Sequence, residues 1–295
     1  MPYTDTSPRI YYEVHGDPAD EPLVLLEGMG AQLIGWRQGF IDMLKAQGLR
    51  VILMDNRDVG MSEKLGGWRD ITARYTVLDM ADDVCRVLDA LGLKSAHLAG
   101  QSMGGVIAQT LAIHRADRLK SLCLIYTAPA FDEALIQPDF WKNLQKPLPR
   151  LPFRMPTWLM TRMVIGDARR CFSEQYPADE AWLRELIRRS MQRGFRMDGL
   201  SRQRAAVMSG FDYRPQLASI TAPTTIIHGR ADHAIKTEAA FELAAGIPGA
   251  GLHVFPGMGH AVAEPLWPDF VSIIARNARR AAIQQAGDTA RLGRI

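Results

Sequence analysis

Segment 100–105 of the chain, GQSMGG, has residue types and a spacing that suit nucleophilic catalysis, because it fits the pattern G-x-S-x-G. It follows the apolar run Ala96–Ala99 and precedes a helical pattern that begins near Met103. A serine on a tight turn between a strand and a helix is held in a strained backbone that presents its hydroxyl group above the sheet. Without that strand and helix, the same letters would describe an ordinary glycine-rich turn. In this context they predict that Ser102 is a nucleophile.

A serine hydroxyl is a weak nucleophile at neutral pH and needs a general base, which is most often a histidine. Of the seven histidines, His260 lies in the loop 256–260, PGMGH, which follows the last apolar run. In a parallel sheet, that loop lies at the same carboxyl edge as the Ser102 turn. His97 and His253 fall inside apolar runs, where a packed core histidine is the better interpretation. We therefore predict that His260 is the base.

An imidazole base needs an acidic partner that fixes its tautomer and stabilises the imidazolium ion. Asp232 follows the apolar run Thr225–Ile227, so it also lies past the carboxyl end of an expected strand. The order serine, acid, histidine along the chain is one in which such triads occur. The loop after Leu122–Tyr126 is the alternative place for the acid, and Asp132 is its nearest candidate. A surface aspartate in a turn is the other interpretation of Asp232.

Short apolar runs without strict alternation must position these residues, and such runs are typical of strands covered on both faces. Helical patterns separate the early runs. One begins after Thr76, where Asp79 three residues later predicts a capping box. Alternating strands and helices imply a mostly parallel sheet with right-handed crossovers. The expected strands are Ile10–Val14, Leu23–Leu26, Val51–Met54, Ala96–Ala99, Leu122–Tyr126, Thr225–Ile227 and Leu252–Phe255.

The strand pattern stops near Ala128 and returns after Pro223, and prolines followed by helical patterns fill the interval. We therefore expect an α/β core formed by residues 1–127 and 220–283, interrupted by a helical insertion at 128–219. We call this insertion the cap segment, and we expect it to act as a lid that sets substrate choice. Residues 284–295 read as a frayed polar tail.

Taken together, these motifs resemble the α/β-hydrolase superfamily over nearly the whole chain. The resemblance depends on EGMG at 27–30, DNRDVGMS at 55–62, the Ser102 turn and the loops that hold Asp232 and His260. It implies the α/β-hydrolase fold, an α/β class with a mostly parallel central sheet, flanking helices and a helical lid. The second aspartate of the 55–62 motif, Asp58, is similar to that of an esterase branch that includes anthracycline methylesterases.

The resemblance also implies an oxyanion hole. Members of the superfamily use the backbone N–H group after the nucleophile, here that of Met103, and one from the loop after an early strand, here that of Met29. Many members have His-Gly where this chain has Glu27-Gly28, and Glu27 brings a carboxyl group near the site. The serine nucleophile argues against the chemistry of haloalkane dehalogenases and epoxide hydrolases, in which an aspartate stands at this position.

The cap segment is rich in methionine and tryptophan, which could line a pocket that accepts varied groups. We expect Trp158, Met160, Met163 and Trp182 to bind substrate, while packing of the cap on the core is the alternative interpretation. From Arg150 to Arg204 there are 12 arginines, no lysine and 6 acidic residues. Most of these arginines fit solvated helix faces, and a second hypothesis is that they attract anionic substrates.

Composition excludes several other classes. The chain has 295 residues, 47% hydrophobic and 23% charged, and a net charge of +3 that is too small to indicate nucleic-acid binding. Three cysteines without CxxC spacing suggest neither a disulfide framework nor a zinc site. No signal peptide or membrane-spanning run is evident, so we expect a cytoplasmic protein. We expect no cofactor or metal, no nucleic-acid partner and no stable membrane insertion, and a monomer or homodimer.

These observations predict a serine hydrolase that cleaves short- to medium-chain carboxylic esters through an acyl-enzyme intermediate. Three alternatives remain. The enzyme could cleave another bond, such as a C–C, lactone or amide bond; it could be a dedicated methylesterase; or the chain could be a ligand receptor that retains the triad and signals through its lid.

Overall fold

A seven-stranded sheet forms the centre of the computed structural model, which describes residues 2–67, 70–72, 74–146 and 157–292. The strand order is β1-β3-β2-β4-β5-β6-β7, with β1 antiparallel to β3 and every other neighbouring pair parallel. Each expected apolar run overlaps one strand, so the mostly parallel α/β sheet is confirmed. The strands are β1 (Tyr12–His15), β2 (Glu21–Leu26), β3 (Leu49–Met54), β4 (Ala96–Gln101), β5 (Leu119–Ile125), β6 (Thr224–Gly229) and β7 (Gly251–Phe255).

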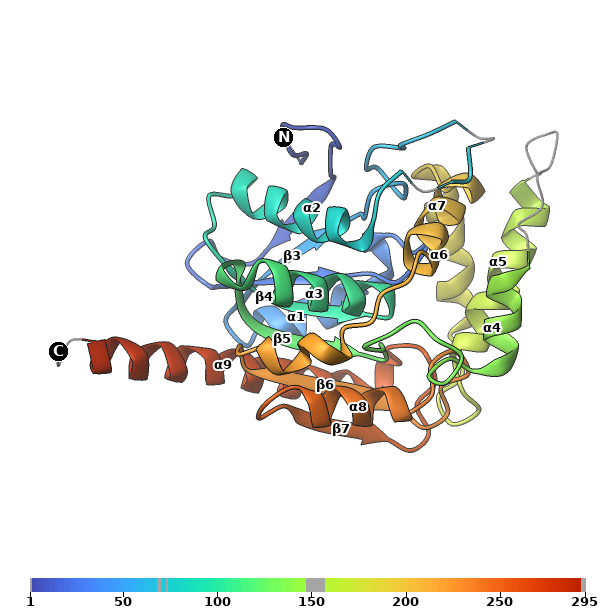
Figure 1. Ribbon diagram of the computed structural model, residues 1–295. Coiled ribbons are helices and arrows are strands. Elements are labelled where there is room, and N and C mark those ends of the chain that lie inside the picture. Colours follow the sequence, from blue (N-terminus) through green and yellow to red (C-terminus); the bar gives the residue numbers. More distant parts are fainter. Residues whose placement is uncertain (1, 68–69, 73, 147–156, 293–295) are drawn as a thin grey trace.

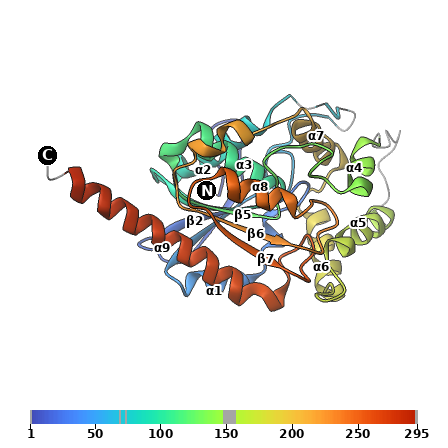
Figure 2. The same cartoon turned by 60° about the horizontal axis from the view of Figure 1, so that its bottom comes forward.

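Helices cover both faces of this sheet. Figure 2 shows α1 and α9 side by side on one face and α2, α3 and α8 on the other. The core helices are α1 (Gln38–Lys45), α2 (Val77–Ala90), α3 (Met103–His114), α8 (Glu238–Gly246) and α9 (Trp267–Leu292), and the short 3-10 helices of the core are Leu33–Gly35, Ala116–Arg118 and Glu264–Leu266.

Alternate side chains of the strands point to opposite faces of the sheet and build two apolar layers. In β2, Val24 and Leu26 pack toward α2 and α3, whereas Leu23 and Leu25 pack toward α1 and α9. All four side chains are fully buried, and burying one such side chain contributes about 1.5–3 kcal/mol. The sheet is therefore held from both sides, and its carboxyl edge is a rigid platform for loops.

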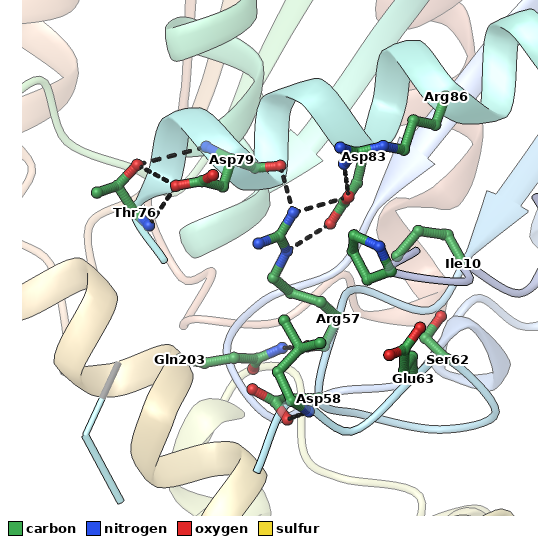
Figure 3. Close-up of polar contacts among 12 residues, drawn as sticks. Ile10, Arg57, Asp58, Ser62, Glu63, Thr76, Asp79, Asp83, Arg86 and Gln203 are labelled. Carbon is green, nitrogen blue, oxygen red and sulfur yellow. Dashed lines mark hydrogen bonds and ion pairs between the residues drawn. The ribbon is translucent and has the colours of Figure 1, made fainter. Parts of the chain in front are cut away.

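The predicted capping box at the start of α2 is present. The backbone N–H of Asp79 donates to Thr76 Oγ1 at 3.4 Å, and the Thr76 N–H donates to Asp79 Oδ2 at 2.8 Å. One turn further, Asp83 is buried and accepts two hydrogen bonds from the Arg57 guanidinium, at 2.6 and 2.8 Å. Helix α2 thus fixes the loop after β3 (Figure 3).

Between β5 and β6 the described residues form helices and no strand beyond isolated bridges. These helices are α4 (Pro138–Gln145), α5 (Thr157–Cys171), α6 (Glu180–Gln192), α7 (Met197–Met208) and the 3-10 helix Arg214–Ser219. Figure 1 shows α4, α5, α6 and α7 gathered at one end of the sheet, opposite the end from which α9 projects, whereas the 3-10 helix that follows them packs against α8 and α3 of the core. The division of the chain into a core and a lid stays a prediction.

Helix α9 differs from the expected polar tail. It continues to Leu292, so the part of 284–295 that the structure describes is helical, because nothing in that stretch breaks the helix begun at Trp267. None of the helices in the described part of the chain has the length and apolar character needed to cross a membrane.

Candidate active site

Ser102 lies between β4 and α3 with φ 54° and ψ −120°, a backbone conformation that is strained for a residue other than glycine. Its N–H donates to the Ile125 carbonyl at 2.9 Å, and its carbonyl accepts from Thr127 Oγ1 at 2.8 Å. A Cβ on Gly104 would clash with the Leu26 carbonyl, so the close approach of α3 to β2 requires glycine. These contacts hold the sharp turn that the sequence predicts.

Asp232 and His260 form a close pair in the loops after β6 and β7. His260 Nδ1 lies 2.7 Å from Asp232 Oδ2, while Asp232 Oδ1 accepts from the backbone N–H groups of Ala234 and Ile235 at 2.7 and 3.0 Å. Burial alone would raise the pKa of Asp232, but His260 and the other partners outweigh it and lower this pKa. The carboxylate therefore stays ionised and orients the imidazole ring.

Tyr126 places His260 and Ser102 against the same strand end. The Tyr126 and His260 rings lie 4.5 Å apart between centroids, and Tyr126 directly follows Ile125, the residue that accepts from the Ser102 N–H. The structure thus brings Ser102, Asp232 and His260 to one edge of the sheet, through β4, β6 and β7. Their catalytic roles remain predictions.

The loop after β2 lies against this serine. A Cβ on Gly28 would be 3.4 Å from Ser102 Cβ and 3.9 Å from Ser102 Oγ, so the loop backbone runs within van der Waals reach of the serine side chain. The next residue is Met29, whose N–H donates to none of the described residues. Met103 begins α3, where the free N–H groups and the helix dipole favour negative charge. Both residues predicted to supply oxyanion donors, Met29 and Met103, therefore line the same cavity as Ser102.

A buried polar chain that the sequence reading missed runs beneath these residues. The Tyr126 hydroxyl donates to Gln101 Oε1, and Gln101 Nε2 donates to Glu27 Oε2. Burial raises the pKa of Glu27 to about 8, an effect that the hydrogen bond from Gln101 only partly opposes. Glu27 thus replaces the usual histidine with a carboxyl group that is mainly neutral at pH 7. The position of Tyr126 directly after a strand was the available signal.

A small apolar cavity of about 50 Å³ opens beside Ser102. The side of the cavity contributed by the cap segment includes Leu144, Val207 and Met208, and Arg204 is the charged residue among its described lining residues. Pockets for drug-sized ligands measure about 300–1,000 Å³, so this cavity admits only a small group unless side chains move. Its other lining residues are Met29, Met103, Val106, Ala128, Ala130, Phe131, Ile136, Phe140, Phe211 and Ile235.

The substrate residues expected from the cap lie elsewhere. Trp158 and Met163 on α5 are 68% and 44% exposed, and neither lines the cavity beside Ser102. The side chain of Met160 lies outside the described part of the structure. Trp182 lines a separate cavity of about 240 Å³, where the Arg37 guanidinium lies 5.1 Å from the ring centres of both Trp182 and Trp267. Their substrate contacts stay a prediction that this geometry does not support.

Comparison with known proteins identifies the same fold and the family of this chain. Residues 21–264 match the family model for the alpha/beta hydrolase fold. A Variovorax paradoxus protein named for carbamate hydrolysis, RutD, is 29% identical over 85% of this chain and 89% of its own length. The rhodomycin D methylesterase DauP of Streptomyces sp. strain C5 is 28% identical over 93% of this chain and 96% of its own.

A solved structure, the enol-lactonase from Burkholderia xenovorans LB400, superposes with a TM-score of 0.74 at 24% identity, covering 94% of this chain and 99% of that one. The chain belongs to the α/β-hydrolase family, and it is a hydrolase. The fold and family that the sequence predicts are therefore confirmed, while the bond that the protein cleaves is not fixed by these relatives.

Proposed function

We propose that the protein is a serine hydrolase of carboxylic esters in which Ser102, His260 and Asp232 form the triad. The observation that carries this proposal is the 2.7 Å contact of His260 Nδ1 with the ionised Asp232, on a ring packed against the strand end that holds Ser102. Donation from Nδ1–H to the carboxylate leaves Nε2 unprotonated, which is the tautomer that a general base needs.

The reaction proceeds in two halves. Ser102 Oγ forms a bond to the ester carbonyl carbon as its proton passes to His260 Nε2, and the carbonyl electrons move to oxygen. The N–H groups of Met29 and Met103 bind this oxyanion, and the loss of one such donor typically costs about 3–4 kcal/mol. The oxyanion electrons then return to carbon, the bond between that carbon and the alcohol oxygen breaks, and His260 protonates the leaving alcohol. Water repeats the sequence on the acyl-enzyme, breaks its bond to Ser102 Oγ and releases the acid.

The size of the cavity supports a short acyl group. A volume of about 50 Å³ with a mainly apolar lining fits a few carbon atoms, and longer chains require movement of the side chains that α4 and α7 contribute. Activity should therefore fall as the acyl chain of the ester lengthens.

A dedicated methylesterase is the second candidate, supported by the similarity to DauP over 93% of the chain and by the second aspartate, Asp58. In that case the acid part of the ester is large and the alcohol is methanol. Hydrolysis of a C–C, lactone or amide bond and a receptor function remain alternatives, and slow turnover accompanied by a large cap rearrangement would favour the receptor.

A chain-length series of p-nitrophenyl esters, assayed with the wild type and Ser102→Ala, tests the proposal. We expect the fastest turnover with the shortest acyl groups, and the loss of both turnover and fluorophosphonate labelling in the variant. Labelling of the variant at the wild-type rate would show that another residue is the nucleophile. A methyl ester of a bulky acid, assayed in parallel, separates the two candidates.

A further inference from the structure

Gln203, on the cap helix α7, is fully buried and joins two loops of the core through the two ends of its side-chain amide. Its Oε1 accepts from the Gly30 N–H at 2.8 Å, and its Nε2 donates to the Arg57 carbonyl at 2.8 Å. The first loop is the one that contains Met29, and the second follows β3. Gln203 thus bonds the backbone next to a proposed oxyanion donor.

The Arg57 end of this bridge is anchored. The Arg57 guanidinium donates twice to Asp83 and once, at 2.7 Å, to the Asp79 carbonyl, and it lies 4.9 Å from the centre of the Tyr75 ring. Figure 3 shows Gln203 beside the Arg57 backbone, with the Arg57 side chain directed toward α2. A bidentate pair between a guanidinium and a carboxylate is among the strongest polar contacts. The Arg57 carbonyl that accepts from Gln203 therefore has a fixed position.

The Gly30 end of the bridge holds a tight turn that has few other hydrogen bonds. Gly30 has φ +75°, and a Cβ there would come within 2.7 Å of Leu200 Cδ1, so the turn is both left-handed and pressed against α7. The loop has few other bonds: Gly28 N–H donates weakly to Glu27 Oε2 at 3.3 Å, and Ala31 N–H donates to the Gly28 carbonyl at 3.2 Å. The 2.8 Å bond from Gly30 is the shortest in this loop.

The face of helix α7 that carries Gln203 also attaches the helix to the core. Gly199 packs directly on the Asp58 backbone, and Arg202 pairs with the Asp58 carboxylate at 2.6 and 2.9 Å. Residues 199, 202 and 203 share one face of a helix because they are three and four positions apart. The position of Gln203 is therefore set before any substrate binds.

We infer that Gln203 is a positioning residue that holds the Gly28–Gly30 loop so that the Met29 N–H points at the oxyanion. This inference rests on the proposed function, in which Met29 is an oxyanion donor. An interaction that exists to aim this donor acts mainly in the transition state, so its loss lowers kcat more than it raises KM. A misplacement of about 1 Å at a reacting centre costs up to about 100-fold in rate.

The test compares Gln203→Met, which keeps the volume and removes both hydrogen bonds, with Asn277→Leu. Asn277 is a matched control because its buried amide also joins two segments of the core: its Nδ2 donates to the carbonyls of Leu122, within β5, and Pro223, just before β6, at 2.9 and 3.0 Å. We expect Gln203→Met to lower kcat for a short p-nitrophenyl ester about 10–100-fold, with KM within about threefold, and to slow fluorophosphonate labelling. Asn277→Leu should lower Tm and leave kcat unchanged.

Gln203→Glu adds a second measurement, the pH dependence of kcat relative to the wild type, which a purely structural role of Gln203 would not change. Its carboxylate retains an acceptor for Gly30 but donates to Arg57 only when protonated, so the ratio of its kcat to that of the wild type should rise as pH falls from 8 to 5. Wild-type kcat in Gln203→Met, or an equal loss in Asn277→Leu, overturns the inference. If Gln203→Met does not fold, a pH-independent ratio for Gln203→Glu overturns it. Failure of the proposed function is distinct, because Ser102→Ala would then stay active.

Discussion

The strand-end loops and the cap segment are built by different means. Ser102, Asp232 and His260 follow β4, β6 and β7, so the hydrogen-bond register of the sheet sets their spacing. The cap helices lie beyond the sheet, and besides apolar packing they are joined to the core by single buried polar side chains, among them Arg202 and Gln203. Backbone geometry therefore sets the spacing of the three strand-end residues, whereas individual buried side chains join the cap helices to the core.

The largest expected effect follows from removing a strand-end group. Ser102→Ala and His260→Ala should each lower kcat by about 10⁵–10⁶, because triad residues act as a unit. Asp232→Asn should cost about 10⁴, because an amide favours the wrong imidazole tautomer. Measurements of kcat and Tm together test this, since we expect unchanged folding. Full activity of Asp232→Asn would show that another residue is the triad acid, and Asp132 would then be the first candidate.

The next effect concerns the attachment of the cap. Arg202 and Asp58 are both 0% exposed, so Arg202→Met leaves a buried carboxylate without its partner. We expect the free energy of unfolding to fall by about 3–5 kcal/mol in urea titrations. Arg188→Met is the matched control, because its pair with Glu185 is exposed and contributes little. Equal effects of the two variants would show that the cap does not depend on the buried pair.

Glu27 should give the protein a pH-dependent stability. Its pKa rises from 4.5 when unfolded to about 8 when folded, so between these values the folded state binds a proton that the unfolded state has lost. The stability contributed by the neutral carboxyl is therefore complete below pH 4.5 and is lost as pH rises through about 8.

Glu27→Gln keeps the acceptor and removes the titration. Between pH 5 and 8 the free energy of unfolding of the wild type should fall by about 2–4 kcal/mol more than that of the variant, as measured in urea at each pH. Parallel pH profiles of the two proteins would contradict this expectation.

The smallest expected effect tests the hypothesis that the cap arginines attract anionic substrates. Arg204 lines the cavity beside Ser102, and its donors reach the Lys146 carbonyl and Met208 Sδ. We expect Arg204→Met to raise KM about fivefold for an ester that carries a carboxylate, and to leave KM unchanged for a neutral ester of equal length, because a partly exposed charge contributes about 1 kcal/mol. Added salt should weaken binding of the anionic ester to the wild type. A salt-independent KM removes the hypothesis.

The sequence predicts the core well because apolar runs of strand length recur between helices, and each run overlaps a strand. The residues after those runs, Ser102, Asp232 and His260, could be placed at one edge because parallel strands share a carboxyl end. The capping box at Thr76 was also predictable, since it depends on neighbours within one turn.

The cap resisted the same reasoning. Periodicity indicates that Trp158 and Met163 lie on a helix, but a methionine or tryptophan fits a core, a pocket or an exposed face equally well, and both side chains are exposed. Gln203 is one amide on a polar helix, and only the three-dimensional structure shows that Gly30 and Arg57 meet there. The raised pKa of Glu27 likewise depends on burial by residues distant in sequence.

The stacking of Arg37 between Trp182 of α6 and Trp267 of α9 has a practical consequence. One indole belongs to the cap and the other to the core, and the cation between them also pairs with Glu264 at 2.7 Å. Any separation of α6 from α9 alters the surroundings of both indoles and hence their fluorescence. The molecule therefore carries an intrinsic optical reporter, so any movement of α6 relative to α9 is measurable without attached dyes.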